Sequence, residues 1–390
     1  MLVLNQPKLN FVVIGNPENR RVTMFQGALA NLGQPLAKVV SYLDLISKKV
    51  NLIDVVTPNS IVRIDSTGEN FEVEKALLTL GAEAKESLNK TNFSCISIKQ
   101  TQQLIFNKGL ILYPYQWYLG YLELLKIIKE QLNNCPKHQL MNHPDDILLM
   151  FDKSLCHNYL LTNNIAVAPS LGQVSCFDEL QEKMQKKRWH RVFIKLANGS
   201  SASGVVAYQT NGKEHIATTS TKIIKKDSIL YLYNSLKLSV YRNLEEIREL
   251  IDALCKHYVH VERWMPKASF QNSVFDLRVL VIGKKASHVV VRTSKTPITN
   301  LHLLNKRGNL AELQVKIGNS LWKQAMEICE STMELFPKSL YAGIDLMFLS
   351  GFNKQLVLEV NAFGDLLPNI LYNQLDSYEA QILEILENYD

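Results

Sequence analysis

The feature that most constrains the fold is a pair of apolar runs, Tyr341–Phe348 and Gln355–Asn361, which flank a short turn containing a glycine. Apolar runs on both sides of such a turn predict a β-hairpin. Counting outward from the turn places Asp345 opposite Glu359. Because alternate residues of a strand share a face, Asn361 projects beside Glu359. Two carboxylates and one amide oxygen are therefore expected on one patch of the sheet.

Two interpretations of this patch stay open from the residues themselves. Carboxylate and amide oxygens suit Mg²⁺, which commonly completes its coordination with water and substrate phosphates. Under this interpretation the metal ligands are Asp345, Glu359 and Asn361. The alternative is a solvated strand face on which acidic residues happen to meet.

A second hairpin is predicted from Leu277–Ile282 and Ser287–Arg292, and the same counting brings Arg278 close to Arg292. Two guanidinium groups repel each other unless an anion joins them. Asp276 shares the face of Arg278 and could orient one arginine through a bidentate pair, leaving the other for a phosphate or carboxylate. A purely structural Asp–Arg pair is the alternative.

Lys195 ends a predicted buried strand, Val192–Leu196, and a loop of small residues follows it. Small residues let backbone N–H groups approach phosphate oxygens, and a lysine at the strand end can neutralise them. The candidate contacts in the loop are Gly199, Ser200, Ser201, Ser203 and Gly204. An ordinary hairpin closed by small residues is the alternative interpretation.

Two further features could contribute to a nucleotide site. Lys153 lies in a predicted helical stretch with Asp152 and is either a second cation for phosphates or a solvated lysine. The segment Val261–Met265, with Glu262, Arg263 and Trp264, ends a strand. Its backbone and an apolar wall could hold a purine. A core strand with a packed tryptophan explains the same residues.

The remaining pattern predicts an α/β chain with more than one domain. The 390 residues are 46% hydrophobic and 21% charged, which is ordinary for a globular protein. A break after the helical pattern at Trp117–Leu132 places a boundary near residue 143. Beyond it we expect strands and helices at Val205–Tyr208, Ile229–Tyr233, Leu244–His257, Leu321–Leu335 and Ser377–Glu387.

Charge and cysteine patterns exclude several classes of protein. The net charge of +6 comes from dispersed basic residues, so nucleic acid is not an expected partner. The six cysteines have no zinc-ligand spacing and are expected to be reduced. The apolar run Phe11–Ile14 is too short for a signal peptide, and no segment is long enough to span a membrane. The expected location is the cytoplasm.

In chain order, these segments resemble the ATP-grasp superfamily over about residues 144–372, and especially its glutathione-synthetase-like and RimK-type carboxylate–amine ligases. The matching segments are Asp152-Lys153, Phe193-Ile194-Lys195 with its loop, Val261-Glu262-Arg263-Trp264, Asp276-Leu277-Arg278, Arg292, Gly343-Ile344-Asp345 and Leu358-Glu359-Val360-Asn361. Their order, more than any one of them, carries the resemblance. The N-terminal segment Arg63–Asn70 also resembles part of a bacterial ATP-grasp branch, although ordinary turn chemistry explains it equally well.

The resemblance implies an α/β fold in which an N-terminal domain, residues 1–143, precedes two lobes, residues 144–234 and 235–390, that hold ATP between two sheets. It implies that Lys153 and Lys195 contact phosphates and that Glu262 with the backbone near Trp264 holds adenine. Arg292 would face the transferred phosphate, with Arg278 supporting it from behind. Asn300 and His302 match a nearby substrate or phosphate segment, although the glycine pair of RimK-type ligases is missing there.

The activity that the resemblance implies joins a small-molecule or peptide carboxylate to an amine through an acyl-phosphate, releasing ADP and phosphate. The implied cofactors are ATP and two Mg²⁺ ions, with Mn²⁺ as a substitute. A phosphotransferase on the same fold, or a nucleotide-binding regulatory protein without turnover, are the alternatives. Neither the substrates nor the oligomeric state follows from the residues.

Overall fold

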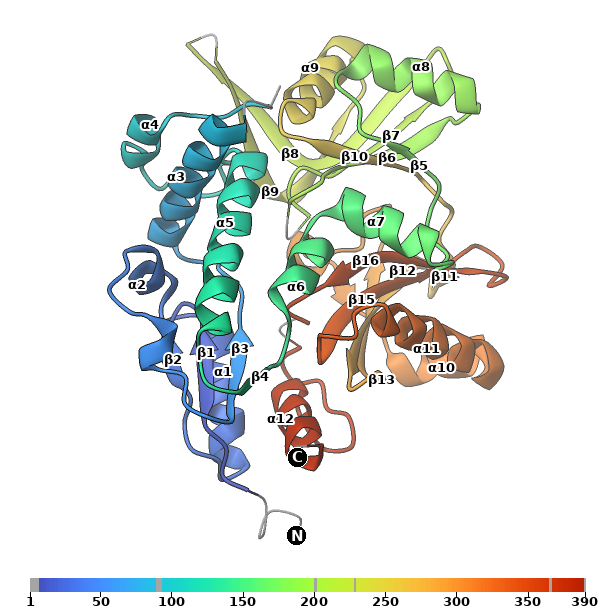
Figure 1. The fold of residues 1–390 in the computed structure, drawn as a ribbon. Helices are drawn as coiled ribbons and strands as arrows, with labels where there is room; N and C mark the ends of the chain where they lie inside the picture. The colour runs from blue at the N-terminus through green and yellow to red at the C-terminus, as the bar shows by residue number, and fades with distance from the viewer. Residues whose placement is uncertain (1–6, 89–92, 200–201, 228, 365–366, 389–390) are drawn as a thin grey trace.

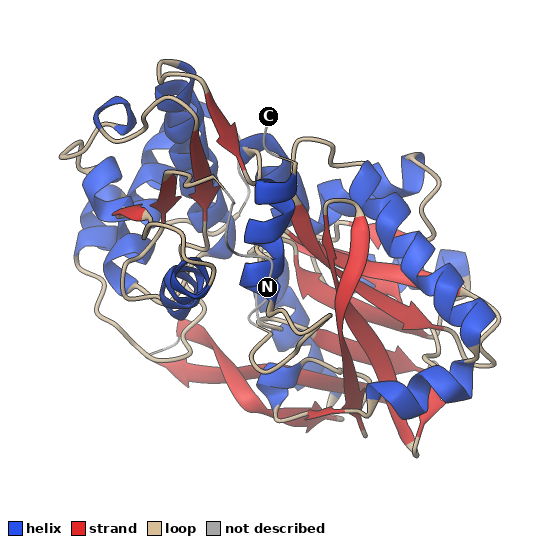
Figure 2. Cartoon of the chain, turned by 90° about the horizontal axis from the view of Figure 1, so that it is seen from below, coloured by secondary structure: helices blue, strands red, loops and turns tan. Residues whose placement is uncertain are grey.

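The computed structural model of the chain describes residues 7–88, 93–199, 202–227, 229–364 and 367–388. They form three sheets that follow one another along the chain (Figure 1). Seen from below, helices separate the four-stranded sheet from the strands of the two six-stranded sheets (Figure 2). None of the described helices combines the length and apolar character that a membrane crossing would require.

The first sheet is parallel, with the strand order β2-β1-β3-β4. Its central strands β1 (Phe11–Ile14) and β3 (Ser60–Ile64) are buried along their whole length, as is usual where helices cover both faces of a parallel sheet. The other elements of this part are β2 (Lys38–Val40), β4 (His138–Leu140), α1 (Arg20–Asn31), α2 (Tyr42–Ile46), η1 (Leu52–Asp54), α3 (Phe71–Leu88), α4 (Ile98–Gln102) and α5 (Pro114–Asn133).

Helices α3 and α5 approach each other closely because each contributes a glycine to their contact. A Cβ atom at Gly81 would lie 1.9 Å from the carbonyl oxygen of Gln116, and one at Gly120 would lie 1.8 Å from that of Leu77. Neither position can hold a side chain at this separation of the helix backbones.

The second sheet is antiparallel, with the order β5-β10-β6-β7-β8-β9. Its members are β5 (Ser170–Gly172), β6 (Arg191–Leu196), β7 (Val206–Thr210), β8 (His215–Lys226), β9 (Ile229–Tyr241) and β10 (Val259–Arg263). Helices α8 (Phe177–Lys187) and α9 (Leu244–Cys255) cover one face of it (Figure 1) and share its apolar core.

The third sheet has the order β14-β13-β12-β15-β16, with β11 added beside β12. Its members are β11 (Ser269–Phe270), β12 (Ser273–Ile282), β13 (Lys285–Ser294), β14 (Lys306–Arg307), β15 (Tyr341–Phe348) and β16 (Gln355–Asn361). The other elements of this part are η2 (Leu301–Leu303), α10 (Leu310–Ile317), α11 (Asn319–Glu334) and α12 (Ser377–Glu387). The β12–β13 hairpin turns at Gly283 and Lys284, both with positive φ, which suits the right-handed twist of its strands.

Two helices, α6 (Pro144–Phe151) and α7 (Lys153–Thr162), connect the first sheet to the second. The expected single helical stretch is wrong in one respect, because the chain breaks at Asp152. The Asp152 carboxylate accepts hydrogen bonds from the backbone of Ser154 and Leu155, so it caps the start of α7.

The two predicted domain boundaries, near residues 143 and 234, can be compared with the limits of the sheets. Residue 143 lies between β4 and α6, in the connection between the first sheet and the rest. Residue 234 lies within β9, and β10 also pairs inside the second sheet, which therefore extends to Arg263. The domain ranges themselves stay a prediction.

Candidate active site

The hairpin β15–β16 forms with the predicted pairing at Asp345, although a register shift between Asp345 and Leu346 separates this pairing from the turn. Asp345 lies directly opposite Glu359, and Gly343 lies opposite Asn361. Asn361 Nδ2 donates a hydrogen bond to the carbonyl oxygen of Gly343 at 3.2 Å. The side-chain oxygen of Asn361 is therefore the atom that could bind a cation beside the two carboxylates.

Two arginines hold Asp345. Arg278 lies opposite Asp345 on the neighbouring strand β12 and donates from Nε to Oδ1 and from Nη2 to Oδ2, the latter at 3.2 Å. Arg292 Nη2 lies 3.0 Å from the same Oδ2. Across the β12–β13 hairpin the two arginines are diagonal neighbours, since Arg278 faces Val290 and Arg292 faces Asp276. The anion that joins them is thus the Asp345 carboxylate.

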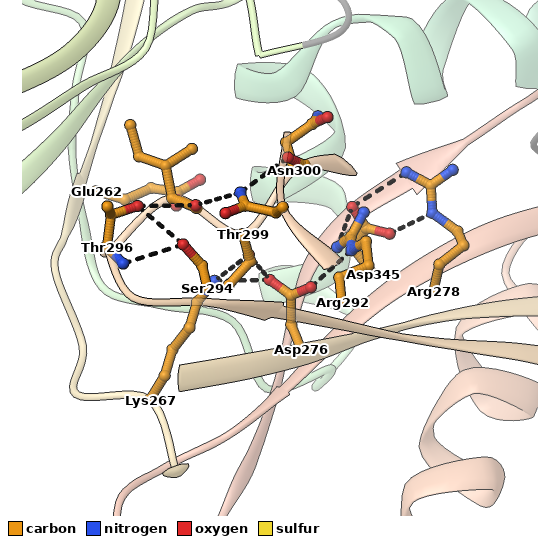
Figure 3. A network of polar contacts seen from close by, with 12 residues as sticks. Glu262, Lys267, Asp276, Arg278, Arg292, Ser294, Thr296, Thr299, Asn300 and Asp345 are labelled. Carbon is orange, nitrogen blue, oxygen red and sulfur yellow. Dashed lines mark hydrogen bonds and ion pairs between the residues drawn. The ribbon is translucent and has the colours of Figure 1, made fainter. Parts of the chain in front are cut away.

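Asp276 gathers three donors in a buried position (Figure 3). Arg292 Nε donates to Oδ1 at 2.6 Å, whereas Lys267 Nζ at 2.6 Å and the Thr299 hydroxyl both donate to Oδ2. Burial raises the pKa of Asp276, but Arg292 and Lys267 outweigh burial and hold that pKa well below its ordinary value. Burial lowers the pKa of Lys267, and Asp276 offsets only part of this effect.

This buried cluster gathers charges of both signs. The cations Arg278, Arg292 and Lys267 lie against the carboxylates of Asp276 and Asp345. Each of these buried charges therefore has a partner of opposite sign, without which its burial would be costly.

The second sheet contributes a separate ion pair. Lys195 Nζ lies 2.7 Å from Glu262 Oε2, between the neighbouring strands β6 and β10. Burial lowers the pKa of Lys195, but Glu262, Glu359 and Asp345 outweigh burial and raise that pKa above its ordinary value. The same pairing holds the pKa of Glu262 well below its ordinary value, against the effect of burial and with help from His260. The influence of Glu359 and Asp345 on Lys195 means that the second and third sheets lie close together here.

Lys153 joins these two sheets. It lies in the first turn of α7, and its Nζ donates to the carbonyl oxygen of Gly199 at 2.5 Å and lies 3.0 Å from Glu359 Oε1. Burial raises the pKa of Glu359, but Lys153 and Lys195 together lower it below its ordinary value. Lys153 therefore contacts both the small-residue loop and the acidic hairpin.

The small-residue loop is described only at its ends, and Ser200 and Ser201 lie outside the described residues. Gly204 has a φ of 66°, and a Cβ atom there would lie 2.4 Å from Leu196 Cδ1. Gly199 is also close to Leu196 and to the carbonyl oxygen of Ser203. Gly204 is thus required by the fold of the loop, whatever ligand it holds, whereas a side chain at Gly199 would be only tight.

Two residues of the expected adenine segment direct their side chains elsewhere. The Arg263 guanidinium lies over the Trp189 ring at 5.6 Å. The Trp264 ring packs on Phe193 with ring centroids 5.4 Å apart, and Arg191 lies over it at 5.6 Å. Of this segment only Glu262 joins the charged groups between the sheets.

Asn300 and His302 lie in the loop after β13. The Asn300 side chain accepts a hydrogen bond from the backbone of His302 at 2.9 Å and caps the short helix η2. The neighbouring Thr299 donates a hydrogen bond to Asp276, which also accepts one from Arg292, and Thr299 accepts one from Lys267 (Figure 3). The loop is therefore connected to Arg292 through Asp276.

Comparison with known proteins gives matches in structure only. No protein-family model matches the chain, and no curated protein matches it in sequence. The ADP complex of PurK, N5-carboxyaminoimidazole ribonucleotide synthetase, matches with a TM-score of 0.56 and 12% identity, over 99% of this chain and 79% of that one. The ATP-grasp ligase PsnB, complexed with a phosphomimetic variant of its minimal precursor, Mg and ADP, matches with a TM-score of 0.52 and 11% identity, over 98% and 99%. The macrocyclase MdnC of Microcystis aeruginosa MRC, bound with its precursor peptide MdnA, matches with a TM-score of 0.52 and 11% identity, over 97% and 99%.

The chain has the ATP-grasp fold. This confirms the expected mixed α/β architecture with two facing sheets. Within the ATP-grasp fold, the predicted residues Lys153, Lys195, Glu262, Asp345 and Glu359 come together between those sheets. Their roles toward a ligand stay predictions.

Sequence reasoning missed two members of the charged cluster around Asp276. Lys267 lies in the link after β10, and Thr299 directly precedes the predicted Asn300. A single lysine in a loop and a single threonine give no periodic signal. Only the folded hairpin, which brings Asp276 between them, reveals their part in the cluster.

The N-terminal segment Arg63–Asn70 contributes a buried pair to a domain contact. Arg63 Nε lies 3.0 Å from Asp65 Oδ2, and its Nη1 donates to Gln381 Oε1 of α12 at 2.7 Å. The Arg63 guanidinium also lies over the ring of Tyr341 in β15 at 5.0 Å. Arg63 thus ties the first sheet to the third.

Proposed function

We propose that the chain is an ATP-dependent carboxylate–amine ligase that works through an acyl-phosphate. The observation that carries this proposal is the contact of Lys153, at the start of helix α7, with Glu359 of the third sheet, beside the buried charged cluster of an ATP-grasp fold. The proposed substrates are a small-molecule or peptide carboxylate and an amine. The complexes of PsnB with a variant of its minimal precursor and of MdnC with its precursor peptide support the inclusion of peptides among them.

The proposed nucleotide contacts lie on both sides of the gap between the sheets. Lys153 and Lys195 would neutralise phosphate oxygens, and Glu262 with the backbone near Trp264 would receive the base. Gly199, Ser203, Gly204 and the undescribed Ser200 and Ser201 would cover the phosphates. The side chains of Arg263, Asn300 and His302 remain proposed contacts without a described partner in the charged cluster.

The chemistry of the acidic hairpin fits magnesium. Two carboxylates and one amide oxygen are hard ligands, and Mg²⁺ takes its other ligands from water and phosphate. Among the described residues, no three His, Cys, Asp or Glu side chains gather as a metal site, so Asp345, Glu359 and Asn361 would hold the ion together with the nucleotide. Bound Mg²⁺ would neutralise charge on the phosphate oxygens. One or two ions fit this donor set equally, and Mn²⁺ could replace them.

The proposed reaction needs no protein nucleophile. A carboxylate oxygen of the substrate forms a bond to the γ-phosphorus as the bond from that phosphorus to the β–γ bridging oxygen breaks and ADP leaves. The amine nitrogen then bonds to the acyl carbon, phosphate leaves with its oxygen, and the amine loses one proton to solvent. Arg292, supported by Arg278, would stabilise the negative charge on the transferred phosphoryl group.

Trapping with hydroxylamine tests the reaction without knowledge of the natural amine. Pools of amino acids and peptides would be incubated with Mg·ATP and hydroxylamine, and products would be identified by mass. The proposal predicts hydroxamates that form together with ADP, and their absence in Glu359→Gln. A product heavier by one phosphoryl group, without capture of the amine, would instead establish a phosphotransferase. Nucleotide binding without any ADP release across the pools would favour a regulatory protein.

A further inference from the structure

Lys267 is the buried charged group that the proposed reaction leaves unexplained. Its side chain is 10% exposed, and it lies in the link between β10 and β11, directly beyond the segment proposed to hold adenine. Its ammonium donates to Asp276 Oδ2 at 2.6 Å and to Thr299 Oγ1 at 2.7 Å (Figure 3). A lysine placed in such a position must be compensated by its partners, because an isolated buried ammonium is very costly.

The contacts of Lys267 fix the side chain of Asp276. Lys267 and Thr299 both use Oδ2, which leaves Oδ1 for Arg292 Nε at 2.6 Å. A carboxylate that is held on one oxygen by two donors has little freedom to rotate. The orientation of Asp276, and through it the plane of the Arg292 guanidinium, therefore depends on Lys267.

The Arg292 guanidinium is in turn held on two of its three nitrogens. Nε donates to Asp276, and Nη2 lies 3.0 Å from Asp345 Oδ2. Within the described part of the chain, Nη1 has no hydrogen-bond or ion-pair partner. Fixing Nε and Nη2 gives Nη1 one direction, which is the arrangement that an anion-binding arginine needs.

From this geometry we infer that Lys267 is a positioning residue, which sets the guanidinium of Arg292 through Asp276 for contact with the terminal phosphoryl group of the nucleotide. This inference rests on the proposed function. Three segments meet at the Asp276 carboxylate: the link after β10, strand β12 and the loop that begins at Thr299. A change in any of the three would therefore alter the position of Arg292.

The test compares the affinities for AMP-PNP and for ADP, both with Mg²⁺, by calorimetry. The ratio of the two affinities reports contacts with the terminal phosphoryl group only. Lys267→Met should weaken AMP-PNP binding about ten-fold, as expected for loss of a hydrogen bond to a charged group, and should change ADP binding less than about two-fold. Lys295→Met is the matched control, because Lys295 lies in the nearby loop, is exposed and, among the described residues, donates a hydrogen bond only to the carbonyl oxygen of Asn272, at 2.6 Å.

A double-mutant comparison separates positioning from a merely structural role. In an Arg292→Ala background, Lys267→Met should cause no further loss of AMP-PNP affinity, since the residue through which it acts is gone. Thr299→Val, which removes a donor to Asp276 without changing any charge, should weaken AMP-PNP binding in the same direction even if Lys267→Met fails to fold. Equal losses for both nucleotides, or a full additional loss in the Arg292→Ala background, would overturn the inference. Absence of nucleotide binding to the unmodified protein would overturn the proposed function, and the role of Lys267 with it.

Discussion

The Asp345 carboxylate can pair either with the neighbouring arginines or with a divalent cation, and this choice affects how metal and nucleotide would bind. Arg278 and Arg292 pair with its carboxylate, and Lys153 pairs with Glu359 in the same way. A divalent cation at the hairpin would have to compete with these side chains. We therefore expect metal and nucleotide to bind together, because phosphate oxygens can replace the carboxylates as partners of the displaced arginines and lysine.

Asp276 is predicted to be the carboxylate whose loss costs most stability in this cluster. Asp276→Asn would leave the buried Lys267 without its counter-ion and Arg292 with Asp345 alone, and we expect a loss of about 3–5 kcal/mol in the free energy of unfolding. Asp178→Asn is the control, since Asp178 is 72% exposed and its pair with Arg248 should contribute less than about 1 kcal/mol. Urea denaturation measures both. Equal effects of the two substitutions would contradict the account of the cluster.

The pH dependence of stability should follow the carboxylates. The pKa values of Glu262, Asp276 and Glu359 are all lower in the folded protein than their ordinary values, so the unfolded chain takes up protons first as the pH falls. Stability from these groups is present above their ordinary pKa of about 4 and is lost below it. Unfolding followed at pH 7, 5, 4 and 3 should show this loss, with a shallower slope in Asp276→Asn. A slope unchanged by that substitution would mean that the Asp276 pKa is not depressed.

At the scale of elements, the sequence predicts the β15–β16 hairpin and the pairing of Asp345 with Glu359. It does not predict the whole register, because a shift between Asp345 and Leu346 separates this pair from the pairs nearer the turn, where Phe348 faces Gln355. Strand β8 was missed because its residues, His215–Lys226, mix threonine, serine and lysine without an apolar alternation. The break at Asp152 was also missed, since a capping aspartate is hard to distinguish from a helical one without the following hydrogen bonds.

The contact between α3 and α5 gives a prediction for helices. Gly120→Ala would place a methyl group against the carbonyl oxygen of Leu77, so we expect it to destabilise the protein by about 1–3 kcal/mol. Gly27→Ala in α1 is the matched control, because its added methyl group would lie within 4 Å of no described atom beyond its chain neighbours and the nearby backbone of its own helix. That control should be neutral or stabilising by up to about 1 kcal/mol. Thermal unfolding distinguishes them, and a neutral Gly120→Ala would contradict the close contact of the two helices.

At the scale of the molecule, the third sheet contributes both to the charged cluster and to the contact with the first sheet. Its hairpins carry the charged cluster, and Tyr341 of β15 packs in one apolar core with Phe25 of α1 and with α12. Which residues meet at such a contact depends on how whole sheets are placed, and neither periodicity nor spacing along the chain reports this. The contacts of Arg63 with α12 and β15 could not be foreseen for that reason.

Arg63 should hold the first sheet to the rest of the molecule. Arg63→Ala would remove a buried cation from Asp65 and a hydrogen bond from Gln381, at an expected cost of about 3–5 kcal/mol. Arg242→Ala, at an exposed position, should change stability by less than about 0.5 kcal/mol. Limited proteolysis and urea denaturation would report the loosened contact. If Arg63→Ala were as stable as the control, the domain contact would have to rest on the apolar core alone.

The most direct test of the account is calorimetric titration of Mg·ATP into the protein and into a variant with both Glu359→Gln and Asn361→Ala. We predict that the unmodified protein binds ATP only with Mg²⁺ and that the variant binds at least about ten-fold more weakly. Glu327→Gln, at a position on α11 that is 54% exposed, should bind like the unmodified protein. Mg²⁺-independent binding, equal affinity in the variant, or no binding to either protein would contradict a magnesium–nucleotide site at this hairpin.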